Sequence, residues 1–337
     1  MSPDLPPALR AALDRALEGV PRKGLAERAA RTSQAYRAGR PSADVIREAD
    51  DALAYALTRL PATYAACATV LAGAQRMAPD FAPTRLLDAG AGTGAASWAA
   101  LQVWPGLASV VWLDASAPFL ALAAQLAAEG PPALREAEVR RVDITTSGPW
   151  PRSDLVVASY ALAEIPKDRQ ASIIGELWAA CEGVLALVEP GTPDGYARLI
   201  GARAALITAG ATLAAPCPHQ ADCPLVGDDW CHFSVRLPRS RDHRLAKGAE
   251  VPFEDERFIY LLAARPGLAL RPRARRVLAP PRTGKPGISL KLCGLDGQVE
   301  QRLVSKRERP AYALARRLAW GDTVPSEPTE TSDAQEP

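Results

Sequence analysis

Short apolar runs alternate with helix-length stretches in the middle of the chain. Four of these runs, at 85–88, 110–114, 154–158 and 184–188, are almost continuously apolar. Such runs are typical of parallel strands that are buried on both faces, with helices as the connections between them. The pattern therefore predicts an α/β fold with a doubly wound, mostly parallel sheet within residues 79–265.

The chain on either side of this region has a different pattern. Residues 1–78 are rich in Ala, Leu and Arg and show helical spacing around Leu53 and Leu57, so they predict an N-terminal helical region. Residues 266–322 contain short β-like pieces separated by Pro and Gly turns, which predicts a small C-terminal β-domain. Residues 323–337 are polar and Pro-rich, and we expect a disordered tail there.

The composition and charge limit the classes of function. No apolar run approaches the roughly 20 residues that span a bilayer. The N-terminus also lacks the features of a signal or transit peptide, so we expect a cytoplasmic protein with no membrane partner. The net charge of +2 hides a basic segment at 235–310, with 18 Lys and Arg against 8 Asp and Glu. This excess favours a polyanionic partner, although a solvated basic surface explains it equally well.

The segment LLDAGAGTGAASWAA at 86–100 predicts a strand, a glycine-rich turn and a helix. Gly90, Gly92 and Gly94 allow a tight turn and the close approach of a ligand to the backbone at a helix N-terminus. Asp88 ends the strand before the turn. The spacing resembles the first motif of class I S-adenosylmethionine-dependent methyltransferases more closely than the GxGxxG of dinucleotide-binding proteins. A nicotinamide-dependent oxidoreductase is the weaker alternative.

Resemblance to these methyltransferases implies further contacts with the cofactor. Asp114 ends the second strand, where a carboxylate can hold ribose hydroxyls. Asp143 follows the third strand, where these enzymes contact adenine, and the acid before the glycines belongs to the methionine part of their site. The candidate cofactor residues are Asp88, Gly90, Gly92, Gly94, Asp114, Asp143 and Ser159, the last at the end of the fourth strand.

The segment after the fourth strand, ASYALAEIP at 158–166, supplies no recognisable catalytic group. It has neither the Asn/Asp-Pro-Pro-Tyr element that orients a target nitrogen nor the Pro-Cys pair of covalent base methylation. Glu164 is the only acid in this segment, and we interpret it as an exposed carboxylate at a helix start. Cys67 and Cys181 are expected to be small core residues. The catalytic residue is therefore left unknown.

The segment PCPHQADCPLVGDDWCHF at 216–233 concentrates half of the six cysteines in the spacing Cys217-x5-Cys223-x7-Cys231. Clustered thiolates in a reducing compartment suggest a soft metal, which needs a fourth ligand. The spacing lacks the CxxC pairs of zinc ribbons, and proline follows two of the cysteines, which favours an iron–sulfur cluster. We therefore expect a metal-binding insertion at 211–250, whose fourth ligand is one of His219, His232, His243 and Cys293.

Several segments together resemble a methyltransferase-like family of small-ribosomal-subunit proteins with mitochondrial and bacterial members. The resemblance extends from about residue 40 to residue 322, and the cysteine segment is its most specific part. Besides that segment and the glycine turn, it rests on RLPATYAA (59–66), EPGTPDGYARLIGARAAL (189–206), FEDERFIYLLAARP (253–266), KLCGLDG (291–297) and Trp320-Gly321-Asp322.

The resemblance to this family implies a class I methyltransferase fold with a metal-binding insertion and a small β-domain. It implies a [4Fe–4S] cluster held by Cys217, Cys223, Cys231 and Cys293, with zinc as an alternative occupant. It also implies that the partner is small-subunit ribosomal RNA, or an assembly intermediate of the small ribosomal subunit. The protein would either methylate this RNA with S-adenosylmethionine or bind it as a non-catalytic assembly factor, and we expect a monomer.

Overall fold

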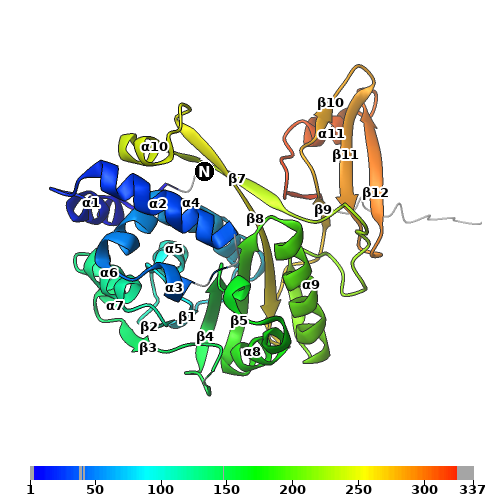
Figure 1. Cartoon of the computed structure of the whole chain (residues 1–337). Helices are drawn as coiled ribbons and strands as arrows, with labels where there is room; N and C mark the ends of the chain where they lie inside the picture. The colour runs from blue at the N-terminus through cyan, green and yellow to red at the C-terminus, as the bar shows by residue number, and fades with distance from the viewer. Residues whose placement is uncertain (1–3, 38–39, 41, 147, 325–337) are drawn as a thin grey trace, which may run out of the picture. The chain divides into compact units, whose positions relative to one another are not determined.

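The computed structural model describes residues 4–37, 40, 42–146 and 148–324. The chain divides into two compact units. The first unit comprises residues up to Ala215 together with Trp230–Arg271, and the second comprises Pro216–Asp229 together with the chain from Pro272 onward. Each unit contains its own sheet (Figure 1).

An eight-stranded sheet forms the centre of the first unit. Its strand order is β3-β2-β1-β4-β5-β8-β6, and β7 pairs with β8. The pairs among β1 to β5 are parallel, whereas β8 runs antiparallel to β5, β6 and β7. The strands are β1 (Arg85–Ala89), β2 (Ser109–Asp114), β3 (Glu138–Arg141), β4 (Ser153–Ser159), β5 (Cys181–Pro190), β6 (Thr212–Ala215), β7 (Phe233–Pro238) and β8 (Phe253–Ala264).

The helices of the first unit form two groups. α4 packs against α5 and α6, while α8 packs against α9, and Figure 1 shows the two groups on different sides of the sheet. The helices are α1 (Pro7–Ala16), α2 (Arg22–Arg37), α3 (Ser42–Val45), α4 (Ala49–Met77), α5 (Ala95–Val103), α6 (Ala117–Ala127), α7 (Pro132–Arg135), the 3₁₀ helix η1 (Leu162–Glu164), α8 (Lys167–Ala180), α9 (Pro193–Thr208) and α10 (Arg241–Lys247).

The apolar runs of the sequence form the central strands, as predicted. Leu87 of β1 lies between Val111 of β2 and Val156 of β4, and Leu87 and Val156 are fully buried. A dinucleotide-binding sheet has the order 3-2-1-4-5-6, with a parallel last strand. Here an antiparallel β8 is inserted between β5 and β6, which is the arrangement of class I S-adenosylmethionine-dependent methyltransferases. The predicted methyltransferase fold is therefore confirmed for this unit.

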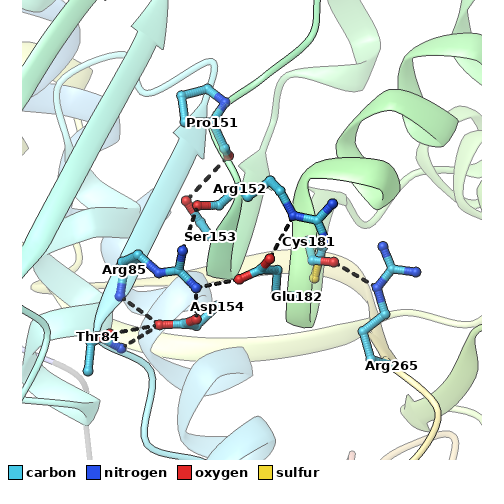
Figure 2. Close-up of polar contacts among 9 residues, drawn as sticks. All are labelled: Thr84, Arg85, Pro151, Arg152, Ser153, Asp154, Cys181, Glu182 and Arg265. Carbon is cyan, nitrogen blue, oxygen red and sulfur yellow. Dashed lines mark hydrogen bonds and ion pairs between the residues drawn. The ribbon is translucent and has the colours of Figure 1, made fainter.

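A polar network joins the amino ends of β1, β4 and β5 (Figure 2). Asp154 accepts hydrogen bonds from the backbone N–H and the hydroxyl of Thr84, both at 2.9 Å, and from the backbone N–H of Arg85 at 3.0 Å. The Arg85 guanidinium pairs with Asp154 and with Glu182, to which Arg152 also pairs. These contacts fix the amino ends of the strands, and ligands of such sheets bind at the opposite, carboxyl ends.

The second unit contains a five-stranded sheet. Its order is β10-β11-β9-β13, and β12 pairs with β11. Val277, Ile288, Leu292 and Val304 are among the residues that form its buried core. The elements are β9 (Arg275–Val277), β10 (Arg282–Thr283), β11 (Gly287–Cys293), β12 (Val299–Ser305), α11 (Arg309–Ala315) and β13 (Thr323–Val324).

Two boundaries differ from the sequence-based expectation. Residues 323–324, which we expected in the tail, form β13 and pair with β9, while 325–337 lie outside the described residues. The cysteine-rich segment leaves the sheet of the first unit after β6 and returns at β7, and both of these strands pair with β8. The segment is therefore an excursion between two strands of one sheet.

Candidate functional site

The glycine turn after β1 adopts a conformation that requires glycine. Gly90, Gly92 and Gly94 have φ values of 73°, 55° and 79°, in the left-handed region that side chains disfavour. A Cβ on Gly90 would lie 2.7 Å from the Cβ of Ala161, whereas a Cβ on Gly92 would meet nothing within 4 Å. The turn is thus packed tightly on one side and open at Gly92, where a ligand can approach the backbone.

Asp114 fixes the conformation of this turn. Its Oδ2 accepts a hydrogen bond from the Gly92 N–H at 2.8 Å, and its Oδ1 accepts one from the Ser116 N–H at 2.8 Å. Burial raises the pKa of Asp114, and the two hydrogen bonds oppose that rise. Because a carboxylate offers about four lone pairs, two acceptor positions remain for the hydroxyls of a ribose.

Asp88 is a buried carboxylate with an unused acceptor. It is 0% exposed, and its Oδ2 accepts a hydrogen bond from the Ser97 hydroxyl at 2.6 Å. Ser97 in turn accepts one from the indole N–H of Trp112 at 2.9 Å. The other oxygen, Oδ1, is buried without a hydrogen-bond partner. Burial raises the pKa of Asp88 to about 6, and a cationic N–H donor placed at Oδ1 would fit this acceptor.

The other two predicted cofactor residues lie at the ends of neighbouring strands. Ser159 ends β4 and is half-buried. Burial raises the pKa of the Cys67 thiol to about 12, with Asp88 acting in the same direction and a hydrogen bond with Ser159 opposing it. Asp143 follows β3, is exposed, and accepts a hydrogen bond from the Thr145 N–H at 2.8 Å. All seven predicted residues thus lie in or just after the carboxyl ends of β1 to β4.

Beyond β4, the structure contains a buried polar group that sequence reasoning missed. Tyr160 has a φ of 57°, a rare conformation for a residue with a side chain. Its hydroxyl donates a hydrogen bond to Glu256 of β8 at 2.8 Å, and Arg59 of α4 lies 3.4 Å from the same carboxylate. The motif RLPATYAA contains Arg59, but nothing in the sequence indicated its partners.

A second missed group lies at the end of β5. Glu189 is 0% exposed and forms an ion pair with Arg198 at 2.7 Å. Its other oxygen accepts a hydrogen bond from the Leu162 N–H at 3.1 Å. Burial raises the pKa of Glu189 to about 7, against the effect of Arg198. This pair joins α9 to the segment that follows β4.

Our interpretation of Glu164 as an exposed helix-start carboxylate is wrong. Glu164 is half-buried and accepts hydrogen bonds from both the N–H and the hydroxyl of Ser42, at 2.9 and 2.7 Å. Burial raises its pKa, and Asp114 and Asp143 act in the same direction, so these three carboxylates share one electrostatic environment. The start of α3 is thereby attached to the segment after β4.

The cysteine-rich segment is divided between the two units. Cys217, Cys223 and Cys293 belong to the second unit, whereas Cys231 belongs to the first. The Sγ of Cys293 lies 3.3 Å from the Nε2 of His219, and both residues are buried. Across the described residues, no three Cys, His, Asp or Glu side chains form a group that could hold a metal ion. The donors suit a soft metal chemically, but their arrangement does not assemble a metal site.

The basic segment forms more internal ion pairs than we expected. Glu254 of β8 contacts the Nζ of Lys247 at 2.7 Å, the Nε of Arg239 at 3.2 Å and the Nε2 of His243 at 3.2 Å. Arg236 pairs with Asp255 at 2.7 Å. These contacts correct the expectation that all the basic residues of this segment face a phosphate. Arg241 and Arg244 of α10 form no ion pair with any residue in the described ranges.

None of the helices within the described ranges is long and apolar enough to cross a membrane.

Among solved structures, the fold is similar to that of magnesium protoporphyrin IX methyltransferase from Synechocystis with bound SAH. The identity is 17%, the TM-score is 0.40, and the match covers 60% of this chain and 83% of the other. It is also similar to a putative RNA methyltransferase from Pyrococcus horikoshii, with 15% identity, a TM-score of 0.41, and coverage of 62% and 87%.

The sequence matches proteins of known family more informatively. It is 28% identical over 291 residues to the human mitochondrial ribosome assembly protein METTL17, covering 81% of this chain and 62% of the relative. It is 25% identical over 331 residues to the mitochondrial Rsm22-cox11 tandem protein 2 of Schizosaccharomyces pombe, covering 82% and 43%. The chain therefore spans less than two thirds of the length of these relatives. Residues 49–325 match the family described as mitochondrial small ribosomal subunit Rsm22, so the predicted family is confirmed and the chain belongs to it.

Proposed function

We propose that this protein binds S-adenosylmethionine at the glycine turn and acts on, or binds, small-subunit ribosomal RNA during ribosome assembly. The observation that carries the proposal is the pairing of Asp114 with the Gly92 N–H, next to the unpartnered oxygen of Asp88. Membership of the Rsm22 family supports the ribosomal part. Calorimetric titration with S-adenosylmethionine and with NAD tests the cofactor: binding of NAD alone would favour the oxidoreductase alternative.

Each residue of the turn has a distinct task in this proposal. Asp114 would hold the ribose hydroxyls, Gly92 would let the nucleoside approach the backbone, and Asp88 would accept a hydrogen bond from the ammonium group. Asp143 would contact the adenine, and Ser159 would line the pocket. When bound, the cofactor supplies an electrophilic methyl group. The protein's own residues bind it, orient it and exclude water.

Two versions of this function differ in whether a methyl group is transferred. In the first, the protein is a ribosomal RNA methyltransferase, and in the second it is an assembly factor that binds the cofactor without turnover. Modified nucleotides of small-subunit ribosomal RNA should be mapped in cells with and without the gene. Loss of one methylated nucleotide that returns with the wild-type gene, but not with an Asp114→Ala variant, supports the enzyme. Identical maps exclude it.

The proposed RNA contact uses α10. Arg241 and Arg244 extend from a helix whose other basic residue, Lys247, is bound to Glu254. Two arginines outside the internal network are suited to phosphates. We include a cytoplasmic location and a monomeric state in the proposal. Both can be tested, by fractionation of cells and by light scattering of the purified protein.

The metal part of the proposal rests on the sequence. Cys217, Cys223, Cys231 and Cys293 would hold a [4Fe–4S] cluster, with zinc as the alternative occupant, since both metals prefer thiolates. Protein purified without oxygen should be brown and contain about four irons per chain. Cys293→Ser should lose this iron, whereas Cys181→Ser, which changes a buried thiol outside the cysteine-rich segment, should retain it. Colourless anaerobic protein with one zinc and no iron would refute the cluster.

A further inference from the structure

The long helix α4 presents a polar stripe that the sequence analysis had placed in a purely helical prelude. Tyr55, Arg59, Thr63 and Cys67 follow one another at intervals of four residues, so they lie along one winding face of the helix. The ring of Tyr55 packs against Phe119 of α6 with centroids 4.8 Å apart. α4 therefore brings four polar or polarisable side chains to one wall of the first unit.

This stripe faces the carboxyl ends of the strands, where the glycine turn lies. Arg59 is 3.4 Å from Glu256, which also accepts the hydrogen bond of Tyr160 just after β4. Cys67, one step further along, interacts with Asp88 and Ser159 at the ends of β1 and β4. The stripe and the predicted cofactor residues thus border the same region.

Two polar atoms in this region are buried without a hydrogen-bond partner. They are the Oγ1 of Thr63, a residue that is 7% exposed, and the Oδ1 of Asp88, a residue that is 0% exposed. A buried polar group without a partner costs about 1–3 kcal/mol. A ligand that supplied a donor to Asp88 and an acceptor to Thr63 would recover this cost, which points to a ligand with both groups close together.

Arg59 adds a positive charge to the stripe. Its side chain is 34% exposed, and its contact with Glu256 is long at 3.4 Å. A guanidinium has five N–H donors and binds carboxylates in a paired geometry. Arg59 is therefore suited to an acceptor that carries a negative charge, next to the hydroxyl of Thr63 and apart from the carboxylate of Asp88.

We propose that α4 forms the subsite for the zwitterionic amino-acid end of the cofactor, with Thr63 and Arg59 binding the carboxylate while Asp88 binds the ammonium. This inference rests on the proposed S-adenosylmethionine binding and assigns specificity within it. A nucleoside that lacks the amino-acid end would gain nothing from the stripe. The pocket should therefore select for the amino-acid end and not only for adenosine.

The test compares two thioether ligands that differ only in this end. Affinities of S-adenosylhomocysteine and 5′-methylthioadenosine should be measured by calorimetry on the full chain. The variants are Thr63→Val, which keeps the shape of the side chain, and Arg59→Gln, and the matched control is Arg76→Gln, which changes an exposed arginine on the same helix. Circular dichroism melts report whether each variant is folded.

We expect the wild type and Arg76→Gln to bind S-adenosylhomocysteine more tightly than methylthioadenosine. Arg59→Gln should weaken S-adenosylhomocysteine by about 10- to 100-fold, the loss of a charge-assisted hydrogen bond, and Thr63→Val by about 3- to 10-fold. Neither change should affect methylthioadenosine by more than about twofold. Equal losses for both ligands, or no loss for either, would overturn the subsite while leaving cofactor binding intact. A wild type that binds neither ligand would overturn the proposed cofactor itself.

Discussion

Replacing Asp88 with Asn tests whether the buried carboxylate beside the glycine turn stores an electrostatic cost. Asp88 is fully buried and forms no ion pair with a described residue, and its known partner is the neutral hydroxyl of Ser97. Burial therefore raises its pKa from 3.8 to about 6, and Asp114 adds to this rise. Charging Asp88 in the folded protein is harder than charging it in the unfolded chain.

The magnitude and sign follow from this difference. A rise from 3.8 to about 6 corresponds to roughly 3 kcal/mol. Between these two pH values the folded state of the wild type binds more protons than the unfolded state. The free energy of unfolding should therefore fall as pH rises from about 4 to about 6, and this loss should be complete above that range. Asn carries no proton at this position, so the variant should lack this slope.

Urea unfolding of the ligand-free protein at several pH values between 4 and 8 measures the slope. The slope is the useful quantity because the amide of Asn introduces a buried donor that costs about 1–3 kcal/mol at every pH. Asp168→Asn, at the exposed start of α8, is the matched control and should follow the wild type. Parallel pH profiles for the wild type and Asp88→Asn would refute the reasoning.

Three further predictions concern other parts of the site. Asp114→Ala should lower the free energy of unfolding by about 2–4 kcal/mol in urea titrations, because two buried backbone N–H groups lose their acceptor, and should weaken S-adenosylmethionine by about 1–3 kcal/mol in calorimetry. Although burial acts to raise the pKa of Glu254, hydrogen bonds from His243 and Lys247 outweigh it and lower that pKa. The stability from Glu254 is thus present above its ordinary pKa of 4.5 and lost as pH falls, so Glu254→Gln should destabilise most at neutral pH, and equal melting temperatures at pH 7 would contradict this. Replacing Arg241 and Arg244 together with Gln should reduce the salt dependence of RNA affinity by about two counterions, and an unchanged slope in filter-binding assays would show that they do not contact phosphate.

The central sheet and the glycine turn could be predicted from the sequence because their signals are local. A continuous apolar run such as 154–158 has few alternatives to a buried strand, and three closely spaced glycines require a turn. The expected positions of Asp88 and Asp114 follow from the order of the strands. These features depend on neighbours along the chain, which a single sequence displays.

The contacts that the sequence could not predict join distant residues. Tyr160 and Glu256 are 96 residues apart, and Ser42 and Glu164 are 122 apart. Helical spacing predicts α4 but does not say which of its faces meets the ends of the strands. The count of basic residues likewise could not show that Glu254 binds Arg239 and Lys247, because β7, α10 and β8 come together only in the folded sheet.

The pairing of β6 and β7 with the same strand makes the cysteine-rich excursion a replaceable module. Ala215 pairs with Leu262 and Phe233 pairs with Phe258, so the two stems lie four residues apart on β8, about 13 Å at roughly 3.3 Å per residue. The sheet closes this loop, and the entropy of closure does not depend on what the loop contains. A lineage could therefore lengthen, shorten or change the ligands of residues 216–232 without disturbing the register of the methyltransferase sheet.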